Sequence, residues 1–328
     1  MVRTGRRRRG YRPAVMAAMV TALGTMALPS AQADGTSGQP PQAAEHAQVG
    51  QVAQEAWRTD FDGSAGSPPS GDDWIVDTGT SYPGGPPNWG TGEVQTYTDR
   101  PENLQLDGEG HLKITALKDG DAWTSARIET RRTDFAAPEG GTMRVSASLK
   151  LPEVSGDQAL GYWPAFWTLG ADYRGNYQNW PGVGEFDIME NVNGQSAAHG
   201  VLHCGVNPGG PCNETTGIGN SATCDGSCQG GFHEYALELD RSGATEELRW
   251  YQDGRLFHTV RESDMDAATW QNATDHGHFV LLNLAMGGAF PNGDAGQDTP
   301  TAATASGGSL LVDHVAVDVT APAGHAAG

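Results

Sequence analysis

The chain has 328 residues and is strongly acidic, with 20 Lys and Arg against 40 Asp and Glu and a formal net charge of −20 at neutral pH. Such a charge repels nucleic acid and anionic membrane surfaces, so neither is expected as a partner. It fits instead a monomer that acts on a neutral substrate.

Residues 1–33 have the three parts of a secretory signal peptide. An arginine cluster is followed by an apolar run over 14–28 and by the cleavage sequence Ala31-Gln32-Ala33. We expect cleavage after Ala33 and a secreted, extracellular protein, with the export route left open. No other segment approaches the roughly 18 apolar residues needed to span a bilayer.

Residues 34–55 are rich in Gln, Ala, Gly and Pro without apolar periodicity, which predicts a disordered leader. One large domain is expected over 56–320, and a flexible tail over 321–328. Apolar residues alternate within this domain and predict strands over 111–117, 143–151, 234–239, 279–284 and 310–319. Residues 248–260 predict a hairpin turning at Asp253-Gly254, and 262–270 a short helix. With 46 Gly and 19 Pro, the pattern indicates an all-β sandwich or jelly roll.

Residues 180–190 read WPGVGEFDIME and place three carboxylates in an otherwise apolar, strand-like run. Period-two geometry puts Glu185 and Asp187 on one face of a strand, but it points Glu190 to the other. All three acids share a face if a β-bulge adds one residue near Ile188 or Met189.

Three adjacent carboxylates cannot all ionise easily, so one keeps a proton while another stays charged. A retaining glycosidase needs this division. On this hypothesis Glu185 is the nucleophile, Glu190 is the acid/base, and Asp187 tunes the nucleophile. An acidic surface strand or a metal site would also fit the three carboxylates.

The four cysteines, Cys204, Cys212, Cys224 and Cys228, lie within 25 residues of sequence in an exported context, which predicts two disulfides. Three pairings are possible. We favour Cys204–Cys212 and Cys224–Cys228, because each closes a small loop rich in turn-forming residues. A zinc site that includes His203 is the rival interpretation.

The stretch Glu185-Phe-Asp-Ile-Met-Glu190 resembles the bulged Glu-x-Asp-x-x-Glu signature of glycoside hydrolase family 16, as found in laminarinases. Segments 88–98, 124–130, 163–169 and 282–288 also resemble family segments in the same order, so the likeness covers 57–319. It implies a β-jelly-roll sandwich of two antiparallel sheets with a concave substrate cleft. It also implies an endo-β-1,3-glucanase acting on a β-linked polysaccharide.

The resemblance also suggests binding residues. It implies that Asn88 and Arg127 bind sugar hydroxyls, and that His203 is either a neighbour of the acid/base or merely structural. Because aromatic rings stack on sugar faces, Trp163 and Trp180 are expected in the cleft, whereas Trp167 fits the cleft or the core equally. Weaker candidates for the cleft are Glu93, Gln95 and Asn283.

No cofactor is expected for catalysis. Many family members hold one structural calcium, and Asp60 and Asp313 occupy the matching segments, although each can also be an ordinary surface residue. The chain departs from common laminarinases in the Cys204–Cys212 insertion and in the loop over 173–180, both expected to wall the cleft. These loops leave mixed-linkage β-1,3(4)-glucan and β-1,3-galactan open as substrates. Transglycosylation and non-catalytic glycan binding also stay open as functions.

Overall fold

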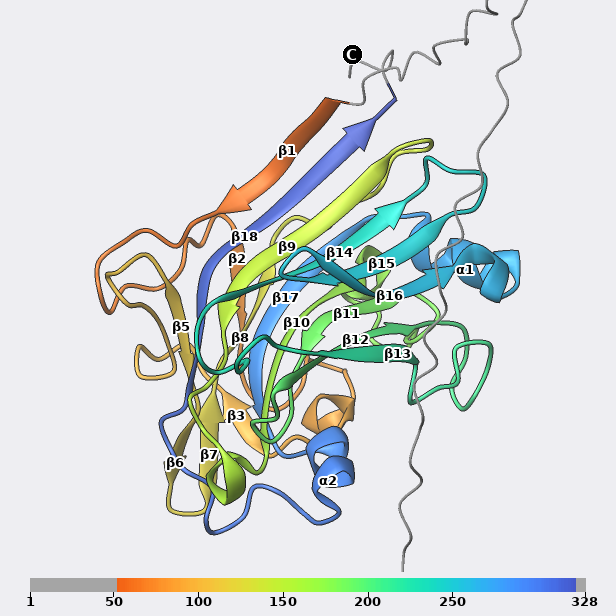
Figure 1. Ribbon diagram of the computed structural model, residues 1–328. Coiled ribbons are helices and arrows are strands. Elements are labelled where there is room, and N and C mark those ends of the chain that lie inside the picture. Colours follow the sequence, from red (N-terminus) through yellow and green to blue (C-terminus); the bar gives the residue numbers. More distant parts are fainter. Residues whose placement is uncertain (1–51, 323–328) are drawn as a thin grey trace, which may run out of the picture. The chain divides into compact units, whose positions relative to one another are not determined.

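The computed structural model describes residues 52–322, so the predicted signal peptide, most of the predicted leader and residues 323–328 lie outside the described part. Strands dominate this part of the chain (Figure 1). They are β1 (Val52–Thr59), β2 (Trp74–Asp77), β3 (Gln95–Tyr97), β4 (Leu104–Leu106), β5 (Leu112–Thr115), β6 (Leu117–Asp119), β7 (Ala122–Ser125), β8 (Arg127–Thr130), β9 (Thr142–Lys150), β10 (Tyr162–Gly170), β11 (Glu185–Glu190), β12 (Ala197–His203), β13 (Ile218–Thr223), β14 (His233–Asp240), β15 (Glu247–Gln252), β16 (Arg255–Arg261), β17 (His278–Met286) and β18 (Ser309–Ala321).

The helices are short. Two are α-helices, α1 (Ala267–Thr274) and α2 (Ala289–Ala295), and four are single 3₁₀ turns, η1 (Pro87–Gly90), η2 (Gly156–Ala159), η3 (Ala171–Tyr173) and η4 (Glu262–Asp264). No helix among residues 52–322 is long and apolar enough to cross a membrane.

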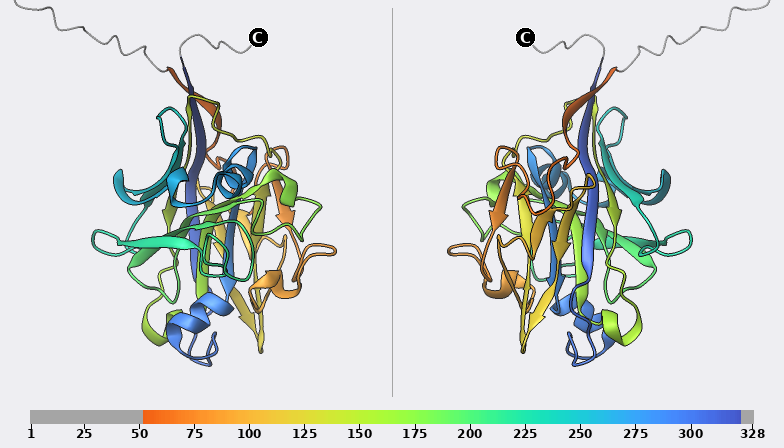
Figure 2. Two further views of the ribbon diagram at one scale, coloured as in Figure 1. Left: turned by 90° about the vertical axis from the view of Figure 1, so that its right-hand side faces the viewer. Right: turned by 90° about the vertical axis from the view of Figure 1, so that its left-hand side faces the viewer.

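Two antiparallel sheets form the jelly roll predicted from the sequence. The first has the order β16-β15-β14-β9-β18-β5-β4, with β1 also paired to β18, and the second has the order β13-β12-β11-β10-β17-β8-β2. Figures 1 and 2 show these sheets face to face, with α1 and α2 at the periphery. A small third sheet, β3-β7-β6, includes the parallel pair of β3 and β7.

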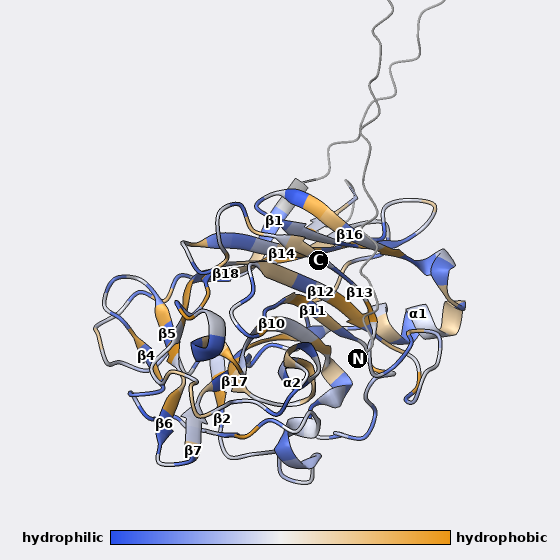
Figure 3. Cartoon of the chain, turned by 60° about the horizontal axis from the view of Figure 1, so that its bottom comes forward, coloured by the Kyte–Doolittle hydropathy of each residue, from blue (hydrophilic) through white to orange (hydrophobic). Residues whose placement is uncertain are grey.

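The core lies between the two large sheets. On β9, Val145 pairs with Leu237 of β14 and with Val317 of β18, and all three side chains are fully buried. Phe166 and Phe186 of the seven-stranded sheet belong to the same hydrophobic cluster. Figure 3 shows the apolar colour mainly along strands and the hydrophilic colour mainly on loops. The alternation in the sequence therefore marks which face of each strand the core covers.

Three local predictions can be compared directly with the structure. The hairpin turn at Asp253-Gly254 is confirmed, and both residues have positive φ, 49° and 73°, as a tight two-residue turn requires. The helix predicted over 262–270 is wrong in its bounds, because η4 and α1 are separate and Asp266 caps α1 by accepting from the Thr269 N–H. The leader predicted to end at residue 55 overlaps β1, which begins at Val52 and pairs with β18.

Candidate active site

Strand β11 carries the three predicted acids and contains the predicted bulge. Its partner β10 sets Phe166 opposite Met189 but Trp167 opposite Asp187, so Ile188 is an extra residue without a partner. The side chains of Ile188 and Met189 are completely buried in the core. The bulge therefore turns Glu190 to the same face as Glu185 and Asp187.

A cavity of about 360 Å³ opens on this face of the seven-stranded sheet. Alternate side chains of β10, at positions 163, 165, 167 and 169, point toward the cavity and form its floor. The cavity is lined by Tyr82, Pro86, Trp89, Gly90, Thr91, Glu93, Arg127, Trp163, Ala165, Trp167, Leu169, Tyr173, Tyr177, Gln178, Trp180, Glu185, Asp187, Glu190, Asn207 and Asn283. All three acids thus face one space that several aromatic rings surround.

Each predicted cleft tryptophan lines this cavity and donates its indole N–H to a polar group there. Trp163 donates to Glu190 Oε1 at 2.9 Å, and Trp180 donates to Glu185 Oε2 at 3.2 Å. Trp167, for which the sequence left core and cleft open, donates to Asn283 Oδ1 at 2.8 Å and is partly exposed to the cavity. Two indoles therefore hold the two outer carboxylates in place.

Burial changes the acidity of the three carboxyl groups. It raises the pKa of Glu185 to about 7, with the charge of His203 opposing the rise. Burial, with the charges of Glu190 and Glu185 added, raises the pKa of Asp187 well above its usual value. Burial also raises the pKa of Glu190, although the hydrogen bond from Trp163 offsets part of the effect. Burial and mutual repulsion therefore make it costly for all three groups to be ionised together.

His203 lies beside the acids, but not beside the one predicted. We expected it to neighbour Glu190, whereas the register of β11 and β12 sets His203 opposite Glu185 and gives Glu190 the partner His199. The Nε2 atom of His203 is 3.4 Å from Asp187 Oδ2 and 4.0 Å from Glu185 Oε1. The bulge does not cause this difference, because Glu185 precedes it; the bulge only moves the partner of Glu190 by one residue, from Ala198 to His199.

The other ring nitrogen of His203 contacts a residue that the sequence did not single out. Its Nδ1 lies 2.7 Å from Oε2 of Glu214, whose side chain is fully buried. Burial alone would lower the pKa of His203, but the hydrogen bond to Glu214 and the charges of Asp187 and Glu185 outweigh it and raise the pKa to about 10. These contacts therefore favour the imidazolium form of His203.

Arg127, a predicted sugar ligand, lines the same cavity beside Tyr82, Trp89 and Trp167. Its guanidinium is buried, donates to Asp77 Oδ2 at 3.1 Å and to the Tyr82 hydroxyl at 2.9 Å, and lies 4.5 and 4.9 Å from the ring centres of Trp89 and Trp167. Burial raises the pKa of Asp77 to about 6 even though Arg127 opposes the rise. These contacts fix the arginine rigidly between aromatic rings.

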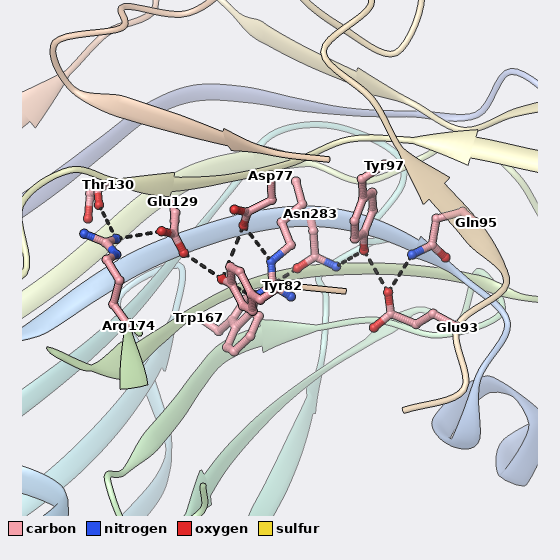
Figure 4. Close-up of polar contacts among 11 residues, drawn as sticks. Asp77, Tyr82, Glu93, Gln95, Tyr97, Glu129, Thr130, Trp167, Arg174 and Asn283 are labelled. Carbon is pink, nitrogen blue, oxygen red and sulfur yellow. Dashed lines mark hydrogen bonds and ion pairs between the residues drawn. The ribbon is translucent and has the colours of Figure 1, made fainter. Parts of the chain in front are cut away.

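Two sets of buried hydrogen bonds, one through Tyr82 and Glu129 and the other through Asn283 and Tyr97, lie beside the cavity (Figure 4). Tyr82 donates to Glu129 at 2.7 Å, and Glu129 pairs with Arg174 at 2.9 Å. On the other side Asn283 donates to the Tyr97 hydroxyl at 3.1 Å, and Tyr97 donates to Glu93 at 2.9 Å. Of the weaker candidates, Glu93 and Asn283 line the cavity, whereas Gln95 lies behind Glu93 and donates to it.

Among the predicted substrate-binding residues, the cavity lining lacks His203, which lies against Asp187, and it also lacks Asn88. Asn88 is exposed in η1, and the next residue, Trp89, lines the cavity instead. Both residues have positive φ, 51° and 55°, which turns Trp89 toward Arg127. Sequence reasoning also missed Tyr82 and Tyr177, whose rings stack with centres 4.4 Å apart in the cavity wall. Their aromatic character in polar loops was the available signal.

The disulfides pair as favoured, Cys204 with Cys212 and Cys224 with Cys228. No free cysteine remains in the described part, so the zinc interpretation is wrong. Asn207 of the first disulfide loop and Tyr173, Tyr177 and Gln178 of the loop over 173–180 line the cavity. Both departures from common laminarinases therefore form walls of the cleft, as expected.

The predicted calcium ligands already have other partners. Asp60 is exposed and paired with Arg58, and Asp313 contacts His314 at 2.7 Å. Within residues 52–322, the only group of three or more acidic, His or Cys side chains close enough to share a metal ion is Glu185, Asp187 and His203. Within this group His203 already lies beside both acids, and its other ring nitrogen pairs with Glu214. Calcium at Asp60 and Asp313 stays a prediction, which a change in melting temperature on chelation would test.

Comparison with known proteins agrees with this geometry. A family profile described as the XgeA-like, catalytic GH16 domain matches residues 150–230. A beta-glucanase of Rhodothermus marinus is 32% identical over 276 residues, which cover 80% of this chain and 83% of the relative. The chain belongs to glycoside hydrolase family 16. It is accordingly a glycoside hydrolase, and the matched residues 150–230 include β11.

Two further similar proteins show how far the likeness extends. The crystal structure of an endo-1,3-beta-glucanase from Streptomyces sioyaensis is 56% identical, with a TM-score of 0.79 over 81% of this chain and 96% of that one. The clotting factor G alpha subunit of Tachypleus tridentatus is 28% identical over 80% of this chain. The chain spans about a third of that relative, namely 34% of its length.

Proposed function

We propose that this family 16 hydrolase is a secreted, monomeric endo-1,3-β-glucanase that cuts internal bonds of laminarin-like glucan with retention of configuration. The observation that carries the proposal is the bulged strand β11, which turns Glu185, Asp187 and Glu190 into one aromatic-lined cavity. The choice of β-1,3-glucan is supported by the named activity of the Streptomyces sioyaensis enzyme at 56% identity.

In the first step the carboxylate of Glu185 attacks the anomeric carbon while the glycosidic C–O bond breaks. Glu190 gives its proton to the departing sugar oxygen, and a glycosyl ester forms on Glu185. The indole of Trp180 and the charge of His203 hold Glu185 and favour its ionised form. Asp187 keeps a proton because burial and its two acidic neighbours make ionisation costly.

In the second step water attacks the anomeric carbon from the side that the first product has left. The ionised Glu190 takes a proton from this water, the ester bond breaks, and Glu185 returns as a carboxylate. Glu190 therefore acts first as an acid and then as a base. Its raised pKa suits the first role, and the indole N–H of Trp163 supports the charged form needed for the second.

The cavity walls suit a neutral glycan. Trp89, Trp167 and Trp180 offer ring faces and edges for sugar C–H groups, while Arg127 and Asn283 offer donors for hydroxyls. Because Arg127 already satisfies the buried Asp77, it presents a donor fork without an uncompensated charge. The clustering of these groups beside the acids supports binding of several sugar units on one side of the scissile bond.

The substrate assignment is tested by reducing-end release from laminarin, curdlan, barley mixed-linkage glucan, lichenan and β-1,3-galactan, using residues 34–328. We expect activity on laminarin and curdlan, and none on galactan. Activity only on galactan would keep the acids and overturn the substrate. Binding without release of reducing ends at any pH would favour a glycan-binding protein instead.

A further inference from the structure

The loop closed by Cys204 and Cys212 is connected to the catalytic acids through two contacts, from Glu214 to His203 and from His203 to Asp187. Cys204 directly follows His203, and Glu214 lies two residues beyond Cys212. The loop thus brings a carboxylate that is far from β11 in sequence to the back of the histidine that faces the acids.

Glu214 is held in place by its backbone and by its side chain. Its N–H and C=O both bond to Gly209, at 2.6 and 2.7 Å, and its Oε1 accepts the Cys204 N–H at 2.9 Å. The remaining oxygen, Oε2, faces His203 Nδ1 at 2.7 Å. Because the side chain is fully buried, its negative charge needs a compensating positive charge nearby.

His203 supplies that charge, because acceptors face both of its ring nitrogens. Nδ1 faces Glu214, and Nε2 lies 3.4 Å from Asp187 Oδ2, a buried oxygen that has no hydrogen-bond partner. The titratable groups around the ring are Glu214 from the loop and the three acids of β11. The carboxylates of Glu214 and Glu185 favour the imidazolium through their charge, whereas the protonated Asp187 of the proposed mechanism offers an acceptor oxygen without a charge.

We propose that Glu214 is a positioning residue that holds His203 as an imidazolium against Asp187 and Glu185, so that the disulfide-closed loop sets the ionisation of the catalytic acids. The proposal rests on the function proposed above for Glu185. The imidazolium lies close enough to Glu185 to favour its carboxylate form, which is the form that attacks. Without this charge the buried nucleophile would need a higher pH to ionise.

Replacing Glu214 with Gln separates charge from shape. The amide has one acceptor oxygen, and the Cys204 N–H requires it, so the amide NH₂ faces His203 Nδ1 and favours a neutral ring. Loss of the negative charge of Glu214 by itself lowers the pKa of Glu185, whereas loss of the positive charge of His203 raises it. The effect of His203 is the larger, because His203 is nearer to Glu185. The net effect of Glu214→Gln is therefore a higher pKa of Glu185.

The first test is the pH profile of laminarin hydrolysis. For Glu214→Gln we expect the acidic limb to move to higher pH, so that the ratio of variant to wild-type kcat/KM falls about tenfold between pH 8 and pH 6. A ratio that stays constant with pH would mean a structural role only and would overturn the proposal. A limb displaced to lower pH would also overturn it.

A second test uses the two disulfides as matched variants. Replacing Cys204 and Cys212 with Ser should move the acidic limb in the same direction as Glu214→Gln, and combining the changes should add little. Replacing Cys224 and Cys228 with Ser should lower the melting temperature without moving the limb. Equal shifts in both disulfide variants, or none in the first, would contradict the role of this loop.

A third test needs no variant that folds poorly and no substrate. Imidazole ¹⁵N signals of His203 in the wild-type protein should show both nitrogens protonated at pH 7 to 8, with assignment from a His203→Gln sample. A neutral ring at pH 7 would overturn the proposal. Absence of activity on every β-1,3-glucan would instead defeat the proposed function and leave this spectroscopic result standing.

Discussion

The indole Nε1 of Trp163 lies 2.9 Å from Oε1 of Glu190 and donates to the carboxyl group that we assign as the acid/base. This donor favours the ionised form and offsets part of the rise that burial causes in the pKa of Glu190. Trp163→Phe keeps most of the ring but removes the donor. We expect the alkaline limb of kcat/KM to move to higher pH, because Glu190 then keeps its proton longer.

Trp167→Phe is the matched control for this change, because its indole donates to Asn283 and not to an acid. It should raise KM through weaker sugar contacts and leave the alkaline limb where it was. A limb that moves equally in both variants would mean that loss of ring packing, rather than the hydrogen bond to Glu190, causes the shift.

Glu185→Gln should reduce hydrolysis of laminarin by about 10³-fold or more while the variant still binds glucan, because an amide cannot form the glycosyl ester. Glu190→Gln should reduce it strongly for laminarin but less for aryl glycosides, whose leaving groups need little protonation. Initial rates on both substrates measure the difference. Substantial activity of Glu185→Gln, with mass spectrometry excluding contaminating wild type, would remove Glu185 as the nucleophile.

Glu185→Gln should also make the folded protein more stable than the wild type at alkaline pH. Burial raises the pKa of Glu185 from 4.5 to about 7, so folding favours the protonated form, and this contribution is complete below the unfolded value and lost as pH rises through 7. Glu185→Gln does not titrate. Relative to the wild type, its unfolding free energy should therefore gain on the order of 2 kcal/mol between pH 5 and pH 8. Melting curves at both pH values measure this, and a gain that shrinks with pH would contradict the raised pKa.

Arg127→Met should destabilise the fold by about 3 kcal/mol at pH 8, because it leaves Asp77 buried without its ion partner. The loss should be smaller at pH 5, where Asp77, whose pKa is already raised to about 6, takes up a proton. Adding Asp77→Asn should recover part of the loss. Arg261→Met, at an arginine that is 51% exposed and paired with Glu247, is the control and should cost under about 1 kcal/mol in urea unfolding. Equal losses would show that burial of the pair is unimportant.

Local sequence rules predicted those features of the site that local geometry determines. The position of Glu190, five residues after Glu185, required a bulge, and the structure has it at Ile188. The alternation of β9 and the Asp253-Gly254 turn likewise follow from short-range geometry. The disulfide pairing could be predicted because the paired cysteines are only 8 and 4 positions apart in the sequence.

The features that the sequence did not predict depend on contacts between distant segments. Nothing in the spacing indicated that Glu214 reaches His203, because the path of the disulfide loop decides it. Likewise Trp89, rather than Asn88, faces the cavity because two consecutive residues of η1 have positive φ. The pairing of β11 with β12 likewise placed His203 opposite Glu185, four positions along β12 from His199, which is the partner of Glu190.

Time-resolved ¹H NMR of a reduced β-1,3-linked hexasaccharide reports linkage, position of cleavage and stereochemistry in one experiment. We expect internal bonds to break first and the new reducing end to appear as the β-anomer before mutarotation. Release of single glucose units from one end, or first appearance of the α-anomer, would contradict an endo-acting enzyme with Glu185 as its nucleophile.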